Sequence, residues 1–354
     1  MVAGEDAPVV AAARAGDDVA FAALVERHRR ELHVHCYRLL GSFDEAEDLV
    51  QETFLRAWRN LAGFEGRSTV RAWLYRIATN ACLDALDGRS RRVLPQHIAP
   101  PSEPSAAQAL RTDIAWLQPY PDRLWEPVES GERQPDAVVV ARETMELAFL
   151  AAIQHLPPRQ RAVLILRDVL GWPAKDIAEL LNGSVASVNS ASQRARTTLK
   201  EHLPERRHDW APSVAPTRQE RAVLRRYMAA VERADLAAVA ELLADEVRTA
   251  MPPYPMWFQG RDTVVAALAA SWTIGSPNYV GQFRLVPTRA NGRPAAAAYV
   301  RRPDEPAYRP FAIAVLQIAH DHILEMTAFH DPALFPAFAL PPSLPPRPVA
   351  TAYR

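Results

Sequence analysis

The sequence predicts a multidomain protein in which two all-α modules precede an α+β domain. Its 354 residues exceed the length at which a single hydrophobic core keeps growing. The 31 prolines gather in clusters, and the segments between them have helical periodicity up to about residue 203. Runs rich in β-forming residues appear only after residue 217. We therefore expect helical modules at 15–92 and 136–203, a linker at 93–135, an α+β domain at 217–335 and a disordered tail at 336–354.

The first module, residues 15–92, contains no proline and an unusually acidic helix. Ser42 and Glu45 match a capping box at its start. The acids continue beyond the first turn, and Asp48 and Glu52 are spaced so that like charges repel mildly on a helix. We expect a positively charged partner surface to face them.

A second helix of this module follows a loop at 63–68 and carries arginines. We expect its inward stripe to be Val70, Trp73, Ile77 and Ala81. Arg71, Arg76 and Asn80 then project elsewhere, where arginines could hold phosphates beside unstacked bases. The aromatic residues Trp58, Trp73 and Tyr75 are expected in the core rather than on bases.

The second module ends in a helix-turn-helix pattern. Ile177, Leu180 and Leu181 give the first helix an apolar face, and Asn182-Gly183 breaks it. Ser184 then caps a second helix that carries amides, hydroxyls and cations with few acids. Its outward residues are Asn189, Ser190, Gln193, Arg194, Arg196 and Lys200. The pattern favours DNA recognition over a basic surface helix on an ordinary helical hairpin.

Three further features limit the classes of function. Lys plus Arg equals Asp plus Glu, at 41 each, so any DNA-binding face must be local. Cys36 and Cys82 lie in helical runs and are expected as buried free thiols. His28, His33 and His35 lack the spacing of a metal site, and we expect neither metal nor other cofactor. We find no signal peptide or membrane span and expect a cytoplasmic protein without a membrane partner.

The linker and the third domain carry weaker signals. Trp116, Leu117, Tyr120, Leu124 and Trp125 suggest that part of the linker docks on a folded surface. In the third domain we expect a helix at 218–245, strands at 282–287, 295–301 and 311–318, and turns at Asn291-Gly292 and Asp321.

The segment HLPPRQRAVLILRDVLGWPAKDIAELLNGSVASVNSASQRARTTL resembles region 4 of the extracytoplasmic-function sigma factors. This resemblance implies a helix-turn-helix that reads the −35 promoter element. Residues 42–58 resemble sigma region 2.2, which implies that Asp48, Gln51 and Glu52, with Leu55 beside them, bind the polymerase β′ clamp. Residues 64–80 resemble regions 2.3 and 2.4, which implies −10 contacts by Arg67, Arg71, Arg76 and Asn80. Many relatives continue after Leu86 with arginines, where this chain has Asp87-Gly88.

The third domain resembles a SnoaL-like domain of the NTF2-like superfamily, which implies an α+β cone around a pocket. Tyr254, Trp257, Phe258 and Trp272 are its candidate pocket residues, with Met251. If the domain were an enzyme, the candidate proton carriers would be Asp245, His320, Asp321, His322, His330 and Asp331.

The resemblances together imply an alternative sigma factor that is not an enzyme and whose third domain modulates its activity. The implied partners are core RNA polymerase, through the β′ clamp and the β flap, and promoter DNA; an anti-sigma factor or a small-molecule ligand is also compatible. One alternative is a DNA-binding regulator fused to a ligand-binding or catalytic NTF2-like domain. A repressor that acts without polymerase is another, but it leaves the acidic helix unexplained.

Overall fold

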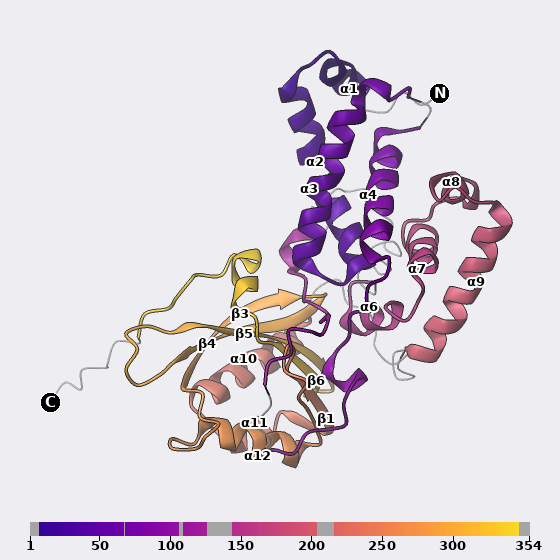
Figure 1. Ribbon diagram of the computed structural model, residues 1–354. Coiled ribbons are helices and arrows are strands. Elements are labelled where there is room, and N and C mark those ends of the chain that lie inside the picture. The colour runs from indigo at the N-terminus through magenta and orange to yellow at the C-terminus, as the bar shows by residue number, and fades with distance from the viewer. Residues whose placement is uncertain (1–6, 67, 106–108, 126–143, 204–215, 347–354) are drawn as a thin grey trace. The chain divides into compact units, whose positions relative to one another are not determined.

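The computed structural model describes residues 7–66, 68–105, 109–125, 144–203 and 216–346, and these form two compact units (Figure 1). The described parts of 1–92 and 124–208 make up the helical unit. The described parts of 93–123 and 209–354 make up the α+β unit. Among the described residues, no helix combines the length and apolar character needed to cross a bilayer.

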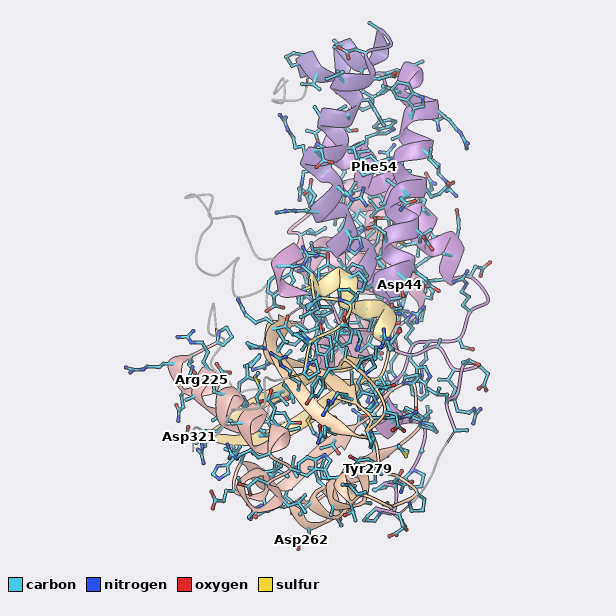
Figure 2. All side chains as sticks on the ribbon, turned by 90° about the vertical axis from the view of Figure 1, so that its left-hand side faces the viewer. Asp44, Phe54, Arg225, Asp262, Tyr279 and Asp321 are labelled. Atoms are coloured by element: carbon cyan, nitrogen blue, oxygen red, sulfur yellow. The ribbon has the colours of Figure 1, made fainter. Side chains whose placement is uncertain are left out.

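The first half of the helical unit is a bundle of α1 (Ala7–Arg14), α2 (Asp18–Leu40), α3 (Phe43–Asn60) and α4 (Val70–Leu86), with a 3-10 turn at η1 (Leu61–Gly63). Phe54 of α3 lies inside this bundle (Figure 2). Ser42 caps α3 as predicted, because its hydroxyl accepts the N–H of Glu45 at 3.3 Å. The Glu45 carboxylate instead pairs with Arg89 at 3.0 Å and Arg92 at 2.8 Å.

The predicted inward stripe of α4 is partly wrong. Val70 and Ala81 are buried, but Trp73 and Ile77 are only half-buried. The buried side chains are Val70, Leu74, Tyr75, Ala78, Thr79, Ala81 and Cys82. Because α4 packs against both α2 and α3, its buried face is wider than one stripe and is centred one residue further along.

The second half contains α6 (Leu147–Ile153), α7 (Pro158–Leu164), a π-helical turn η4 (Ile165–Val169), α8 (Ala174–Leu180) and α9 (Val185–His202). Ile177, Leu180 and Leu181 are buried as predicted. Asn182 adopts a left-handed conformation, with φ of 50°, and Ser184 forms a capping box with Ser187 at the start of α9. The helix-turn-helix is therefore confirmed.

The α+β unit is built on a six-stranded sheet with strand order β2-β1-β6-β5-β4-β3. Its strands are β1 (Leu243–Ala250), β2 (Trp257–Gln259), β3 (Gln282–Ala290), β4 (Arg293–Arg301), β5 (Arg309–Ala319) and β6 (His322–Phe329). β1 and β6 pair in parallel, and the other neighbours pair antiparallel. Helices α10 (Arg218–Glu232), α11 (Leu236–Ala240) and α12 (Arg261–Trp272) lie over one face of the sheet (Figure 1). The three predicted strands and the turns at Asn291-Gly292 and Asp321 are confirmed.

Two predictions for this unit are wrong. The expected single helix at 218–245 ends at Glu232, because Ala234 is left-handed with φ of 52° and Asp235 caps the separate helix α11. The tail at 336–354 is ordered through residue 346. η6 (Pro332–Phe338) buries Phe335 and Phe338, and the hydroxyl of Tyr299 donates to the carbonyl of Pro341 at 2.8 Å. The free energy gained by burying the two phenylalanines outweighs the tendency of a proline-rich segment to stay disordered. Residues 347–354 lie outside the described part of the chain.

Candidate functional sites

One face of α3 combines acids with exposed apolar side chains. Asp48, Gln51 and Leu55 are exposed and share this face, with Glu52 half-buried beside them. Glu52 pairs with Arg56 at 2.7 Å. Leu55 and Trp58 are 50% and 40% exposed, so the expectation of Trp58 in the core is wrong. An acidic face with exposed apolar residues is suited to docking on a partner that carries a basic rim around an apolar patch.

The candidate −10 residues on α4 differ in their exposure and in their partners. Arg71 pairs with Glu31 at 2.7 Å and lies 4.9 Å from the ring centre of Tyr75. Burial alone would raise the pKa of Glu31, but the hydrogen bond from His28 and the charge of Arg71 lower it. Arg76 is exposed and Asn80 is half-buried. Arg67 lies outside the described residues. Arg71 and Arg76 are both exposed, and within the described part of the chain only Arg71 of these two forms an ion pair.

All six candidate residues on α9 are exposed along one side of the helix. Two of them already have partners: Arg196 pairs with Asp168 at 2.6 Å, and Asn189 accepts from Arg167 at 2.5 Å. The others are Ser190, Gln193, Arg194 and Lys200, for which the described structure records no side-chain ion pair or side-chain to side-chain hydrogen bond. The face thus has hydroxyl, amide and cationic groups available for a DNA groove.

The histidines of α2 are structural groups with partners. His28 lies 2.7 Å from Glu31, His33 lies 3.3 Å from Glu47, and His35 lies 2.8 Å from Thr79. Burial lowers the pKa of His33 to about 4 and that of His35 to about 3, so both rings are neutral near pH 7. Cys36 and Cys82 are buried free thiols, as predicted. Within the described ranges no cluster of three or more His, Cys, Asp or Glu side chains could hold a metal.

The α+β unit contains a cavity of about 350 Å³ between α12 and the sheet. Tyr254, Phe258 and Met251 line it, as expected. Trp257 and Trp272 do not. The indole N–H of Trp257 donates to the carbonyl of Ala99 at 2.8 Å, and Trp272 packs on the apolar core beside Phe283.

Only one of the six candidate proton carriers reaches the cavity, and it is His330. Asp245 is exposed and pairs with Arg261 at 2.8 Å. His320 and Asp321 form the turn between β5 and β6, with His322 directly after it, and Asp331 caps η6. Sequence reasoning also missed the wall formed by Asn278 and Tyr279, because no helical or strand periodicity marks that loop.

The linker residues described within 93–123 belong to the α+β unit, whereas residues 124–125 group with the helical unit. Trp116, Leu117 and Tyr120 are buried, which confirms that part of this segment docks. Tyr120 exchanges two hydrogen bonds with Asn291, each of 2.9 Å. At the other end of the segment, Ser102 N–H donates to the carbonyl of Trp257 at 2.7 Å. The docked part is thus the described portion of 93–123 within the expected linker.

Comparisons with known proteins identify three matching segments. Residues 24–92 match the family model for sigma-70 region 2, 146–199 match sigma-70 region 4, and 224–326 match the SnoaL-like domain. The chain is 45% identical over 332 residues to the ECF RNA polymerase sigma factor SigG of Mycobacterium tuberculosis, covering 94% of this chain and 86% of that protein. It is 30% identical over 188 residues to the ECF sigma factor SigW of Bacillus subtilis, covering 53% of this chain and 91% of SigW.

A solved structure shares the fold over most of the chain. The crystal structure of the Mycobacterium tuberculosis extracytoplasmic-function sigma factor SigJ superposes with a TM-score of 0.55 at 23% identity, covering 90% of this chain and 100% of that chain. The predicted fold class, two helical sigma modules followed by an NTF2-like α+β domain, and the predicted resemblance are confirmed.

Proposed function

Because this chain belongs to the extracytoplasmic-function RNA polymerase sigma factors, we propose that it binds core RNA polymerase and directs it to specific promoters. The observation that carries the proposal is the pair of surfaces on the helical unit. α3 has an exposed acidic face within the region 2 match, and α9 has an exposed polar and cationic face within the region 4 match.

Polymerase binding is assigned to Asp48, Gln51, Glu52 and Leu55. The three polar groups complement a basic surface, and Leu55 supplies apolar area at the same face. The β′ clamp is the implied partner of this surface, and the β flap is the implied partner of the module at 136–203.

Promoter contacts are assigned to both helical modules. Arg76 and Asn80, with Arg67 and Arg71, are proposed for the −10 element. Because Arg71 already pairs with Glu31, any contact it makes with DNA requires an exchange of partners.

For the −35 element we propose Arg194, Gln193, Ser190 and Lys200 as direct contacts. Asn189 and Arg196 would contribute after leaving Arg167 and Asp168.

The α+β domain is proposed to modulate initiation through the linker, in the role of a built-in regulator. The linker joins the two helical modules in sequence, and the residues described within 93–123 are docked on this domain. Docking limits the positions that the linker can take. A change in docking therefore changes how the two helical modules can bind polymerase and promoter DNA at the same time. The location of just one candidate proton carrier in the cavity supports ligand binding over turnover.

A binding measurement tests the polymerase assignment. We expect Asp48→Arg in the full chain to weaken its affinity for purified core polymerase by at least about tenfold, because a charge reversal opposes a basic partner surface. Asp304→Arg is the matched control, since Asp304 is exposed on the turn between β4 and β5 of the α+β unit and not on α3. Equal affinities of the natural chain and both variants would reject the assignment of the α3 face.

A further inference from the structure

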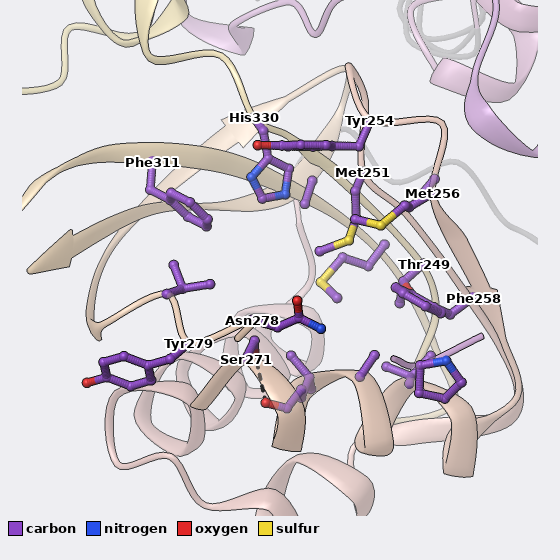
Figure 3. Close-up of a pocket in the computed structure, with 18 of the residues that line it drawn as sticks. Thr249, Met251, Tyr254, Met256, Phe258, Ser271, Asn278, Tyr279, Phe311 and His330 are labelled. Atoms are coloured by element: carbon purple, nitrogen blue, oxygen red, sulfur yellow. Dashed lines mark hydrogen bonds between the residues drawn. The ribbon is translucent and has the colours of Figure 1, made fainter. Parts of the chain in front are cut away.

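The cavity of the α+β domain is largely apolar. Its walls come from β1, β5, β6, α12 and the loop after α12 (Figure 3). Its volume of about 350 Å³ lies within the usual range for small-molecule sites, which begins at roughly 300 Å³. Met251, Met256 and Met326 border it, and unbranched methionines can change rotamer to fit an occupant. The site therefore suits an apolar body better than a polar one.

His330 is a polar group that this cavity leaves without a partner. Its imidazole points from the end of β6 into the cavity, beside Tyr254 and Phe311 (Figure 3). Both ring nitrogens are closed off from solvent, and neither has a hydrogen-bond partner among the described residues. Burial lowers the pKa of His330 to about 4, so near pH 7 the neutral ring offers one N–H donor and one acceptor nitrogen. Leaving both nitrogens without a bond is unfavourable in a buried site, and an occupant with one polar group could make one of these bonds.

The charge distribution of the wall restricts that occupant further. Arg302 is the cation among the lining residues, and it is exposed. The lining residues, all within the described ranges, include no Asp or Glu. A charged ligand body would lose hydration without gaining a buried counter-ion. These lining residues likewise do not form an acid and base pair for catalysis.

We propose that this cavity binds an uncharged, mainly apolar small molecule whose single hydroxyl or carbonyl group bonds to the imidazole of His330. The ring nitrogens are closed off in the described structure, so the occupant reaches them when neighbouring side chains shift; Tyr254 and Phe311 are the rings that pack on the imidazole. Pro104 of the linker also lines the cavity, next to the bond between Ser102 and Trp257. Ligand binding and linker docking therefore share a wall. The inference that ligand binding regulates initiation through the linker rests on the proposed function, whereas the inference that the cavity binds a ligand does not.

A matched pair of probes tests the proposal on the full chain. 2-Naphthol and naphthalene have the same ring system and differ by one hydroxyl, and fluorescence titration measures the binding of each. We expect 2-naphthol to bind about tenfold more tightly, the effect of one hydrogen bond made inside an apolar site. His330→Phe should retain naphthalene binding and lose the preference for 2-naphthol. His322→Phe, at the start of β6 and outside the cavity, should behave as the natural chain does.

A second variant guards against a folding failure of His330→Phe. Ala267 lines the cavity from α12, so Ala267→Phe should fill the space and abolish binding of both probes. Bound 2-naphthol should also slow amide exchange at Ser102. Equal affinity of the natural chain for the two probes, binding of neither, or binding that persists in Ala267→Phe would overturn the proposal. Unchanged amide exchange at Ser102 would overturn the inference that the ligand and the linker share a wall. Because these measurements contain no polymerase, their failure is distinct from failure of sigma activity.

Discussion

The carboxylate of Asp122 accepts a hydrogen bond of 2.8 Å from the backbone N–H of Gly292, which lies 170 residues further along the chain. The same carboxylate pairs with Arg289 at 3.2 Å, and Asp122 is 1% exposed. Arg123 adds a bond to the carbonyl of Ala337 at 2.6 Å. The end of the docked segment is thus fixed to the turn between β3 and β4 by a buried charged group, which makes its docking sensitive to single substitutions.

Asp122→Ala should release this end of the linker. It leaves a buried N–H and a cation without their acceptor, at a cost of about 1–3 kcal/mol in the free energy of unfolding. We expect faster amide exchange across 116–123, measured by mass spectrometry. Asp122→Asn should have a smaller effect, since its amide oxygen can still accept from Gly292. Asp113→Ala is the control, because Asp113 pairs with Arg111 on the surface. If the exchange rates match those of the natural chain, Asp122 does not hold the linker.

Arg161 should be essential to the stability of the helical unit. Arg161 is 3% exposed, and its guanidinium donates to the carbonyls of Leu39, Gln154 and Leu156. Burial lowers its pKa to about 10, so it stays charged near pH 7. Arg161→Met should leave these acceptors unsatisfied and lower the free energy of unfolding by at least about 2 kcal/mol in urea melts. Arg194→Met, an exposed control, should change it by less than about 0.5 kcal/mol. Equal losses in both variants would contradict the role of burial.

Arg194→Ala should reduce promoter binding without affecting stability. Arg194 is exposed on α9, and the described structure records no ion pair for it. If it contacts a base edge, the substitution should cost about 1–3 kcal/mol on the cognate −35 sequence and much less on a scrambled one. Competition between the two sequences for reconstituted holoenzyme measures this difference. A uniform loss on both sequences would instead indicate a phosphate contact.

The helical unit should lose stability as pH falls below about 6.5. Burial lowers the folded pKa of His35 to about 3, while the unfolded value stays near 6.5. The unfolded chain therefore binds more protons between these values, and stability falls with decreasing pH. From pH 7.5 to 5, His35 alone should cost about 2 kcal/mol. His35→Gln should lose less stability over this interval than the natural chain, measured by urea melts at both pH values. Identical losses would show that the pKa of His35 in the folded chain is close to its unfolded value.

Local patterns predicted much of the fold. Ser42, Ser184 and Asn182 determine helix starts and a turn through bonds within a few residues, so their positions could be read from the sequence. Strands β3 to β5 were also predicted, because β-formers alternate with clear turn residues there. The break at Ala234 was missed since no glycine or proline marks it. Order at 336–346 depends on Tyr299 and other residues far away in the sequence, which no local signal reports.

The candidate sites divide in the same way, between surfaces that local patterns predict and contacts that depend on residues far apart in the sequence. The exposed faces of α3 and α9 follow from helical spacing and were placed correctly as surfaces. The pairing of Arg71 with Glu31 and of Arg196 with Asp168 involves separate helices, so the sequence could not reveal it. The position of His330 in the cavity depends on how the sheet curves over α12. Its sequence neighbours therefore gave no reason to prefer it over His320 or His322.

Transcription by reconstituted holoenzyme tests the central claim most directly. Purified core polymerase would be mixed with the full chain on fragmented genomic DNA, and the 5′ ends of the RNA would be mapped. The account predicts discrete start sites that require the chain, share −35 and −10 sequences, and weaken with Asp48→Arg. RNA synthesis that starts at the same positions with core polymerase alone, or no synthesis at any site with the chain present, would contradict it.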